Sequence, residues 1–301
     1  MTVHVAQPEN GAAPAGPVRR EGSQWLALLV GRGGLHLAIV ALTLIWLVPT
    51  VGLLVTSFRP KGDILASGWW TVLAQPNFTW GNYTEVINTQ GMGRAFLNSL
   101  AITVPATLLP VLVAALAAFA FAWIPFPGRN GIFLGIIALL VIPIQMTFVP
   151  VLQILNPLGL TRSYIGIWLA HTAFGLPFAI FLLRNFFILL PADLLEAARL
   201  DGASNLRIFF RIVLPLSVPA LASLTIFQFL GVWNDLLMAL VFIQDPEARP
   251  LTTAISGLLS TYGTEWNLLS AGAFLLMVVP LIVFFSLQRY FVQGLLAGSV
   301  K

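Results

Sequence analysis

The feature that most constrains this chain is a series of apolar blocks, each about as long as a bilayer is thick. A helix needs about 20 consecutive apolar residues to cross the hydrocarbon core of a membrane. The whole chain has 58% apolar and 9% charged side chains, whereas soluble domains carry about 25% charged residues. We therefore predict an all-α polytopic membrane protein. Its six spans are expected at 35–57, 95–122, 131–155, 164–188, 216–244 and 270–290.

Basic residues predict how these spans are oriented. Lys and Arg concentrate in cytoplasmic loops of membrane proteins. With the N-terminus inside, ten of the 15 basic residues are cytoplasmic and five are external. Both termini are then cytoplasmic, the loop 189–215 is cytoplasmic, and the loops 58–94 and 245–269 are external. The cytoplasmic set is Arg19, Arg20, Arg32, Arg129, Arg184, Arg199, Arg207, Arg211, Arg289 and Lys301, and the external set is Arg59, Lys61, Arg94, Arg162 and Arg249.

The expected domain organisation follows from this topology. Residues 1–30, whose first part is rich in Ala, Gly and Pro, are expected to form a disordered cytoplasmic tail. Residues 31–301 form one transmembrane domain with a core at 95–290 and a short cytoplasmic tail at 291–301. The spans also contain prolines, each of which frees a backbone carbonyl and bends a helix, so that neighbouring helices must repair the gap. These are Pro105, Pro110, Pro143, Pro150, Pro177 and Pro280.

The loop 189–215 has the signals of two short helices. Pro191 and Asp193 suit a helix start, where a proline needs no amide partner and a carboxylate can cap free amides. Gly202 suits the left-handed position after a helix end. Ser204 is expected to cap a second helix, 205–213, that ends before Pro215.

The same loop resembles the conserved cytoplasmic loop of ABC importer permeases. That pattern is Glu-Ala-Ala, three residues, Gly, nine residues, Ile, one residue, Leu-Pro. Every position is filled here at the same spacing, by Glu196, Ala197, Ala198, Gly202, Ile212, Leu214 and Pro215. The resemblance implies a coupling helix that docks on an ATP-binding subunit through Glu196 to Gly202, Asp201 included. The alternative is an ordinary amphipathic loop helix.

Other segments resemble the second membrane subunit of maltose-type carbohydrate importers. They are Phe96-Leu97-Asn98-Ser99-Leu100, the final QRYFVQGLLAGSVK with Gly294, Gly298 and Lys301, and the stretches 170–185 and 233–242, which look most like the alpha-glucoside branch. The resemblance implies a type I ABC importer permease fold and import of an alpha-glucoside disaccharide of the trehalose, maltose or sucrose type. It also implies a second, homologous permease subunit, two ATP-binding subunits that the C-terminal tail contacts, and an external sugar-binding protein. The alternatives are an ABC permease for another solute and a secondary transporter.

Some polar residues lie in or near the expected spans. Asp235 and Asn234 fall in the span 216–244, and Gln228 precedes Asp235 by two helical turns. They are candidates for the substrate path, although such residues more often join helices by hydrogen bonds. His171 is isolated, and we interpret it as structural. The external loop 58–94 carries Trp69, Trp70, Trp80 and Tyr83, typical of an aromatic belt at the headgroup level, or else of a docking surface for an external partner.

The sequence also indicates what the chain lacks. There is no G-x-x-x-x-G-K-[ST] loop, and the only lysines are Lys61 and Lys301. ATP and Mg are therefore expected to be used by a partner, and the chain is not expected to be an enzyme or to bind a cofactor. The three histidines are scattered and there is no cysteine, so no metal site is predicted. The net charge of +4 is interpreted as membrane orientation and not as affinity for nucleic acid.

Overall fold

The computed structural model describes residues 22–261 and 265–297, which contain helices and no strand. It divides into two compact units at Gly52–Leu53. The first unit holds most of helix α1 (Gly22–Phe58), which begins before the expected end of the tail at residue 30. In the part of the chain described, four stretches are long and apolar enough to cross a membrane. They are Gly33–Phe58, Met92–Trp123, Tyr164–Phe187 and Trp266–Tyr290.

Two further spans are bent: a bend at Pro143 was expected from the proline, whereas its size and the second bend, at Ser217, were not. The expected span 131–155 is α5 (Arg129–Ala138) with the 3-10 turn η2 (Leu139–Val141), followed by η3 (Ile144–Thr147) and α6 (Phe148–Leu155). The two parts meet at an angle of 100°. Pro143 lies at the bend, and a residue that precedes proline is driven from helical to extended backbone. Ile142 has this extended conformation, with φ −76° and ψ 121°.

The second bend precedes α11 (Val218–Trp233). Helix α9 (Asn205–Ile208), the π-helical turn η5 (Phe209–Val213) and α10 (Leu214–Leu216) form one arm, which meets α11 at 77°. The chain widens into η5 just before Pro215, which lacks the amide that would continue an α-helical ladder. The predicted end of this helix before Pro215 was therefore wrong. The expected span 216–244 was also wrong as one helix, because α11 ends at Trp233 and a separate α12 (Leu237–Phe242) follows.

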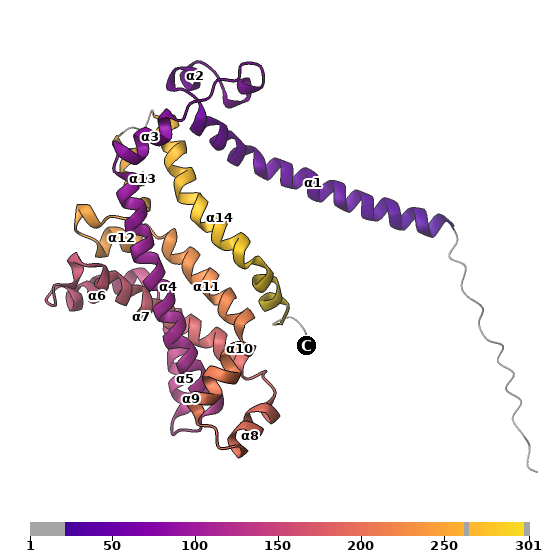
Figure 1. Cartoon of the computed structure of the whole chain (residues 1–301), viewed down its shortest axis with the longest axis vertical. Coiled ribbons are helices and arrows are strands. Elements are labelled where there is room, and N and C mark those ends of the chain that lie inside the picture. The colour runs from indigo at the N-terminus through magenta and orange to yellow at the C-terminus, as the bar shows by residue number, and fades with distance from the viewer. Residues whose placement is uncertain (1–21, 262–264, 298–301) are drawn as a thin grey trace, which may run out of the picture. The chain divides into compact units, whose positions relative to one another are not determined.

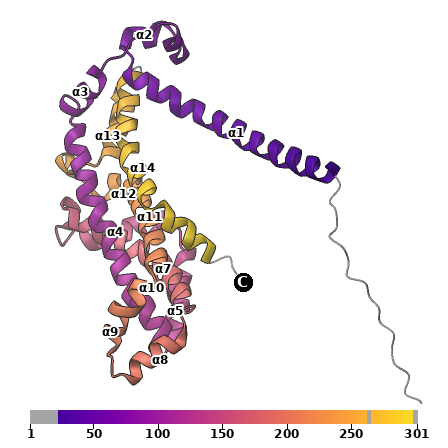
Figure 2. The ribbon, with the colours of Figure 1, turned by 45° about the vertical axis from the view of Figure 1, so that its right-hand side comes forward.

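Four helices of the second unit form its packed centre. Helix α4 (Met92–Trp123) packs against α7 (Tyr164–Phe187) and α11, and α11 packs against α14 (Trp266–Ala297). Figures 1 and 2 show these helices side by side. The buried face of α4 is rich in alanine, with Ala106, Ala114 and Ala118 fully buried. Small residues let helix backbones approach closely where no hydrophobic force acts between helices in lipid.

Three prolines of these helices each leave the carbonyl four residues earlier without an amide donor, and a side chain of a neighbouring helix donates to it instead. Pro105 cannot donate to the carbonyl of Ala101, and the indole Nε1 of Trp168 on α7 donates to it at 3.0 Å. Pro280 leaves the carbonyl of Leu276, to which Trp233 Nε1 on α11 donates at 2.8 Å.

Pro110 repeats the pattern more weakly. It leaves the carbonyl of Ala106, four residues earlier, and Gln228 Nε2 on α11 donates to it at 3.4 Å. We call these three contacts the proline-carbonyl bonds. For these three of the six prolines named above, the predicted repair is made by a donor on the helix packed alongside.

The second unit has two functional ends. At the lower end in both views lie α8 (Ala192–Leu200) and α9, beside the end of α4. At the opposite end lie α2 (Lys61–Ala66), η1 (Trp69–Leu73) and α3 (Gly81–Asn88), together with η6 (Pro246–Ala248) and α13 (Leu251–Thr261). The turn η4 (Leu160–Arg162) precedes α7. We refer to the α8 end and the α3 end below.

Candidate functional site

Helix α8 begins and ends close to where its sequence predicts. Pro191 is its N-cap residue, with φ −58°. Asp193 lies in the first turn, where a negative charge is favourable. No side chain caps the start of α8, so the prediction that Asp193 caps its free amides was wrong.

The C-terminal end of α8 is a Schellman motif. Gly202 has φ +77°, the left-handed conformation that glycine adopts without strain. Its amide donates to the carbonyl of Arg199 at 3.0 Å, and the Ala203 amide donates to that of Ala198 at 2.9 Å. This pair of bonds defines the motif. The role predicted for Gly202 as the helix terminator is confirmed.

Ser204 begins the next helix. Its Oγ accepts from the amide of Arg207 at 3.4 Å, as an N-cap side chain does. The cap was therefore predicted correctly. The loop thus consists of α8, one left-handed glycine and a capped second helix, and its shape is set by local backbone geometry.

Side chains on the inner face of α8 fix it to the end of the helix bundle. Leu195 is fully buried in the same apolar cluster as Leu183 and Phe209. The Arg199 guanidinium donates to the carbonyl of Trp123, the last residue of α4, at 3.0 Å. The Trp123 indole in turn donates to the carbonyl of Phe187, the last residue of α7, at 2.9 Å. Helix α8 is therefore joined to the ends of both α4 and α7.

The opposite face of α8 is exposed and contains two large apolar side chains. Leu200 is 89% exposed and Leu194 is 48% exposed. Of the four apolar side chains Leu194, Leu195, Ala198 and Leu200, only Leu195 and Ala198 face the core. We define the outer face of α8 as six exposed residues from Leu194 to Gly202, leaving out Arg199, whose guanidinium binds the Trp123 carbonyl. They are Leu194, Glu196, Ala197, Leu200, Asp201 and Gly202.

The remaining motif residues are in the arm that follows. Ile212 and Leu214 are half-buried, and Pro215 is exposed. Between Ile212 and Leu214, Val213 is fully buried in the cluster that receives Leu195. The motif therefore has two physical parts: Glu196 to Gly202 carries the exposed surface, and Ile212 to Pro215 returns the chain to the core.

The three candidates for the substrate path are separated by the structure. Gln228 packs over Gly175, where a Cβ atom would lie 2.9 Å from its amide, and it makes a proline-carbonyl bond. Asp235 was predicted to lie within a helical span, but it lies in the link between α11 and α12. There its Oδ1 accepts from the Met238 amide at 2.9 Å and starts α12. Both side chains hold helices in place.

Asn234 is the candidate that faces a cavity. It is exposed, and with Thr252, Trp266 and Ser270 it lines a pocket of about 460 Å³. Ser270 is 1% exposed, and its Oγ has no hydrogen-bond partner within the described part of the chain. An amide, two hydroxyls and an indole ring are groups that suit a polyhydroxylated solute, although most of the pocket wall is apolar.

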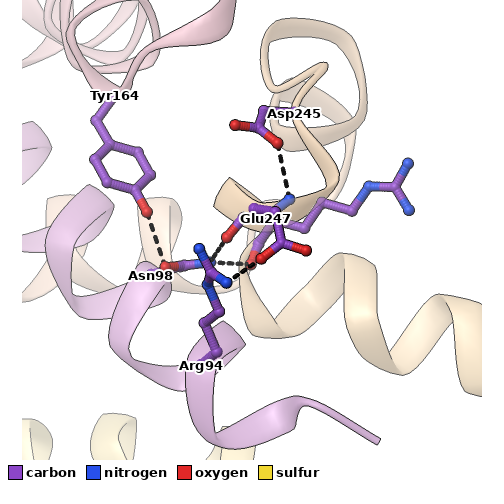
Figure 3. Close-up of polar contacts among 6 residues, drawn as sticks. Arg94, Asn98, Tyr164, Asp245 and Glu247 are labelled. Atoms are coloured by element: carbon purple, nitrogen blue, oxygen red, sulfur yellow. Dashed lines mark hydrogen bonds and ion pairs between the residues drawn. The ribbon is translucent and has the colours of Figure 1, made fainter.

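A polar network at the α3 end was missed by the sequence analysis. Figure 3 shows Asn98 at its centre. The Asn98 Nδ2 donates to the carbonyls of Glu247 at 2.8 Å and Arg249 at 2.9 Å, while its Oδ1 accepts from the Tyr164 hydroxyl at 2.8 Å. Asn98 is 8% exposed. It joins α4, α7 and the loop before α13.

Two further contacts strengthen this network. Arg94 pairs with Glu247 on the surface. Ser99 Oγ accepts from the Leu251 amide at 2.8 Å and so holds the start of α13. The available signal was the Asn98-Ser99 pair, which the sequence analysis used only as part of a resemblance.

The remaining predictions concern the C-terminal tail, a metal site and His171. Gly294 lies within α14, whereas Gly298 and Lys301 lie outside the described residues. Among the residues described, no group of three His, Cys, Asp or Glu side chains could hold a metal ion. His171 is 7% exposed on α7, in agreement with its structural interpretation.

Known proteins resemble this chain along most of its length. The family model described as "Binding-protein-dependent transport system inner membrane component" matches residues 110–296. The osmoprotective compounds uptake permease protein GgtD of Synechocystis sp. is 53% identical over 89% of this chain and 91% of that protein. The alpha-glucoside transport system permease protein AglG of Rhizobium meliloti is 39% identical over 95% of this chain and 99% of that protein.

A solved structure has a similar fold. A chain of a bacterial ABC transporter involved in the import of the acidic polysaccharide alginate superposes with a TM-score of 0.67. The superposition covers 91% of this chain and 99% of that chain at 21% sequence identity. At that identity, the likeness is one of fold.

Proposed function

Because the chain belongs to the family of inner membrane components of binding-protein-dependent transport systems, we propose that it is the permease subunit through which an alpha-glucoside disaccharide crosses the membrane. The chain is a multi-pass membrane protein with the all-α, type I ABC importer permease fold that was predicted. Its relatives are permease components of sugar-type importers, so the prediction that the chain is not itself the ATPase is confirmed.

The carbohydrate class is supported by several relatives, and the alpha-glucoside assignment by one of them. AglG is a permease protein for alpha-glucosides, and AraQ of Bacillus subtilis, at 32% identity, is one for arabinooligosaccharides. The pocket that Asn234 lines offers this permease a place for a solute hydroxyl at the α3 end. We assign Asn234 to the path, and Gln228 and Asp235 to the packing of its walls.

The outer face of α8 is the proposed contact with an ATP-binding subunit. Its support is the seven-residue motif together with an exposed face on which Leu200 is 89% exposed. Exposed apolar patches on otherwise charged loops mark interaction surfaces. By this proposal the inner face, through Leu195 and Arg199, passes the movement of the ATPase to α4 and α7.

The complete importer is proposed to contain other chains. They are a second homologous permease subunit, two ATP-binding subunits that use ATP and Mg, and an external sugar-binding protein. The C-terminal tail with Gly294, Gly298 and Lys301 is proposed to contact the ATPases, and both termini to be cytoplasmic. The family description, which names dependence on a binding protein, supports the last partner.

The test is the ATPase activity of the reconstituted importer. The complex contains this chain, its permease partner, the ATPase subunit and the binding protein. We expect trehalose, maltose or sucrose to stimulate ATP hydrolysis, and an amino acid to leave it unchanged. Stimulation by an amino acid alone would support the assignment as an ABC permease and reject the assignment of a carbohydrate substrate.

A second solute class is favoured by one observation. The 53% identical relative is an uptake protein for osmoprotective compounds. The same assay therefore includes glycine betaine, an osmoprotectant that is not a sugar. If betaine stimulates hydrolysis and none of the three disaccharides does, the alpha-glucoside assignment is rejected in favour of osmoprotectant uptake.

A further inference from the structure

The segment 59–80, which follows α1 directly, is folded around one buried arginine. Arg59 is only 4% exposed. Its Nη1 donates to the carbonyls of Ser67 at 3.3 Å and Gly68 at 2.8 Å. Its Nη2 donates to the Asp63 carbonyl at 3.1 Å, to Ser67 Oγ at 2.8 Å and to Thr71 Oγ1 at 3.2 Å. One guanidinium therefore satisfies three backbone carbonyls and two hydroxyls. We call this segment the aromatic cap.

The base of the aromatic cap is closed and attached. The Thr79 amide donates to the Phe58 carbonyl at 2.6 Å, so the two ends of the segment meet. Asn82 Nδ2 on α3 donates to the carbonyls of Ser57 and Arg59, both at 2.9 Å. Asn267 Nδ2 on α14 donates to Asn82 Oδ1 at 2.9 Å. The cap is therefore a fixed structure at the α3 end.

The outer side chains of the aromatic cap are large and apolar. Exposed fractions run from 61% for Phe78 to 88% for Leu73. The other charged groups of the cap have partners: Lys61 forms an ion pair with Glu265 at 2.6 Å, and Asp63 accepts a hydrogen bond from Asn77 at 2.8 Å. An exposed apolar patch of this kind needs a partner. Its members are Leu65, Trp70, Leu73, Phe78 and Trp80.

We propose that the aromatic cap lies in the outer headgroup layer of the membrane, with its apolar patch in contact with lipid. The cap starts at the residue after Phe58, where the candidate span Gly33–Phe58 ends, and therefore at the boundary of the hydrocarbon. Tryptophan is enriched at that depth. Three backbone carbonyls of this irregular segment are satisfied within the protein, which suits a position next to the water-free hydrocarbon. Arg59 supplies those bonds.

This proposal does not depend on the solute that the permease transports. It assigns Arg59 a structural role for which lysine is a poor replacement, since five donors in a rigid fork cannot be copied by a single ammonium group. It also distinguishes the cap from a surface for an external protein, which would face water in the resting importer.

The chain contains no cysteine, so single cysteines can be introduced without background. Leu73→Cys and Phe78→Cys on the patch are compared with Glu85→Cys, an exposed position on α3. Each carries a nitroxide label in the full importer, reconstituted in phosphatidylcholine–phosphatidylglycerol nanodiscs. Oxygen partitions into lipid, so we expect it to relax the labels at 73 and 78 more than a water-soluble nickel chelate does. At position 85 we expect the nickel chelate to relax the label more than oxygen does.

A reversed order at 73 and 78, matching that at 85, would overturn the proposal. So would labels at 73 and 78 that reach the nickel chelate until the binding protein is added and then become protected, because the patch would then be a protein-docking surface.

A second variant tests Arg59 itself. In the Leu73→Cys background, Arg59→Met should make the nickel chelate relax the label more than oxygen does. Arg249→Met, which changes an exposed arginine of the same end, should leave oxygen the stronger relaxant. An unchanged order in Arg59→Met would show that the guanidinium does not hold the cap in place.

Discussion

At the scale of single residues, the structure shows where polar groups in an apolar protein find partners. Trp168, Trp233 and Gln228 each donate to a carbonyl that a proline has deprived of its amide. Without these side chains the carbonyls would be buried in protein or lipid with no donor, which costs roughly 1–3 kcal/mol each. The two tryptophans therefore contribute their N–H groups as well as their size.

A double-mutant cycle tests this for Trp233 and Pro280. Trp233→Phe should destabilise the protein because the Leu276 carbonyl loses its donor. In a Pro280→Ala background, the restored amide serves that carbonyl, and the cost of Trp233→Phe should fall by about 1 kcal/mol. The measurement is the equilibrium unfolded fraction in mixed detergent–SDS micelles.

The control for this cycle is Pro105→Ala, which restores an amide to the Ala101 carbonyl that Trp168 binds. It should not change the cost of Trp233→Phe. Equal costs of Trp233→Phe in all three backgrounds would mean that the indole N–H contributes nothing through the proline.

The network around Asn98 gives a second prediction at this scale. Asn98→Ala removes the amide that donates to two part-buried carbonyls and should lower the free energy of unfolding by about 2 kcal/mol. Arg94→Gln breaks the neighbouring ion pair, whose side chains are 63% and 64% exposed, and should change it by less than about 1 kcal/mol. Unfolding in mixed micelles compares the two variants directly. An Arg94→Gln cost as large as that of Asn98→Ala would contradict the assignment of Asn98 as the centre of the network.

At the scale of elements, α8 is a helix with two unlike faces. Leu195 is fully buried, whereas Leu200 is 89% exposed. We expect Leu195→Ala to cost roughly 2–5 kcal/mol of stability. Leu200→Ser should leave stability nearly unchanged and weaken binding of the ATP-binding subunit, measured by co-purification from detergent. Loss of stability in Leu200→Ser would show that this side chain is covered within the chain itself.

Gly202 provides the other prediction for α8. Open space surrounds its Cα, so a substitution is resisted by its φ of +77° and not by a neighbour. A β-branched residue is strained there, whereas asparagine tolerates this conformation. Gly202→Val should abolish sugar uptake into proteoliposomes without affecting sugar binding by the external protein, and Gly202→Asn should retain uptake. Normal uptake with Gly202→Val would contradict the coupling role of the loop.

The same elements show what could be predicted from the sequence. Local rules located the end of α8 at Gly202 and the cap at Ser204, because both depend on a few adjacent residues. A bend at Pro143 was expected from the proline, but its angle of 100° and the bend at Ser217 were missed, since hydropathy gives the length of an apolar block and not the direction of its axis. Asp235 was predicted within a helix because its apolar block, 216–244, was interpreted as one straight span. The Asn98 network joins residues about 150 positions apart, and no local rule predicts such a pairing.

At the scale of the whole molecule, the second unit has two ends of different chemistry. The α8 end carries the exposed motif, and the α3 end carries the aromatic cap, the Asn98 network and the pocket of Asn234. The long helices α4, α7, α11 and α14 connect them. The proposed transport cycle needs ATP-driven movement at one end to change access at the other.

This arrangement predicts that the two ends lie on opposite sides of the membrane. With no native cysteine, Leu200→Cys and Glu85→Cys can each be labelled with a membrane-impermeant maleimide. Glu85→Cys should react in intact cells, and Leu200→Cys only after permeabilisation, since the positive-inside rule favours a cytoplasmic α8. Reaction of Leu200→Cys in intact cells would invert the topology.

The proline-carbonyl bonds also restrict how the helices of the permease can move relative to one another. A helix whose backbone carbonyl is held by its neighbour cannot rotate about its own axis without losing that bond. Helix α11 is held in this way to α4 and to α14, and α4 to α7. We therefore expect these four helices to move as one stiff block, with torsion concentrated at the bends at Ser217 and Pro143. The residues that set the mechanical stiffness of the permease are then its prolines and the side chains that complete them.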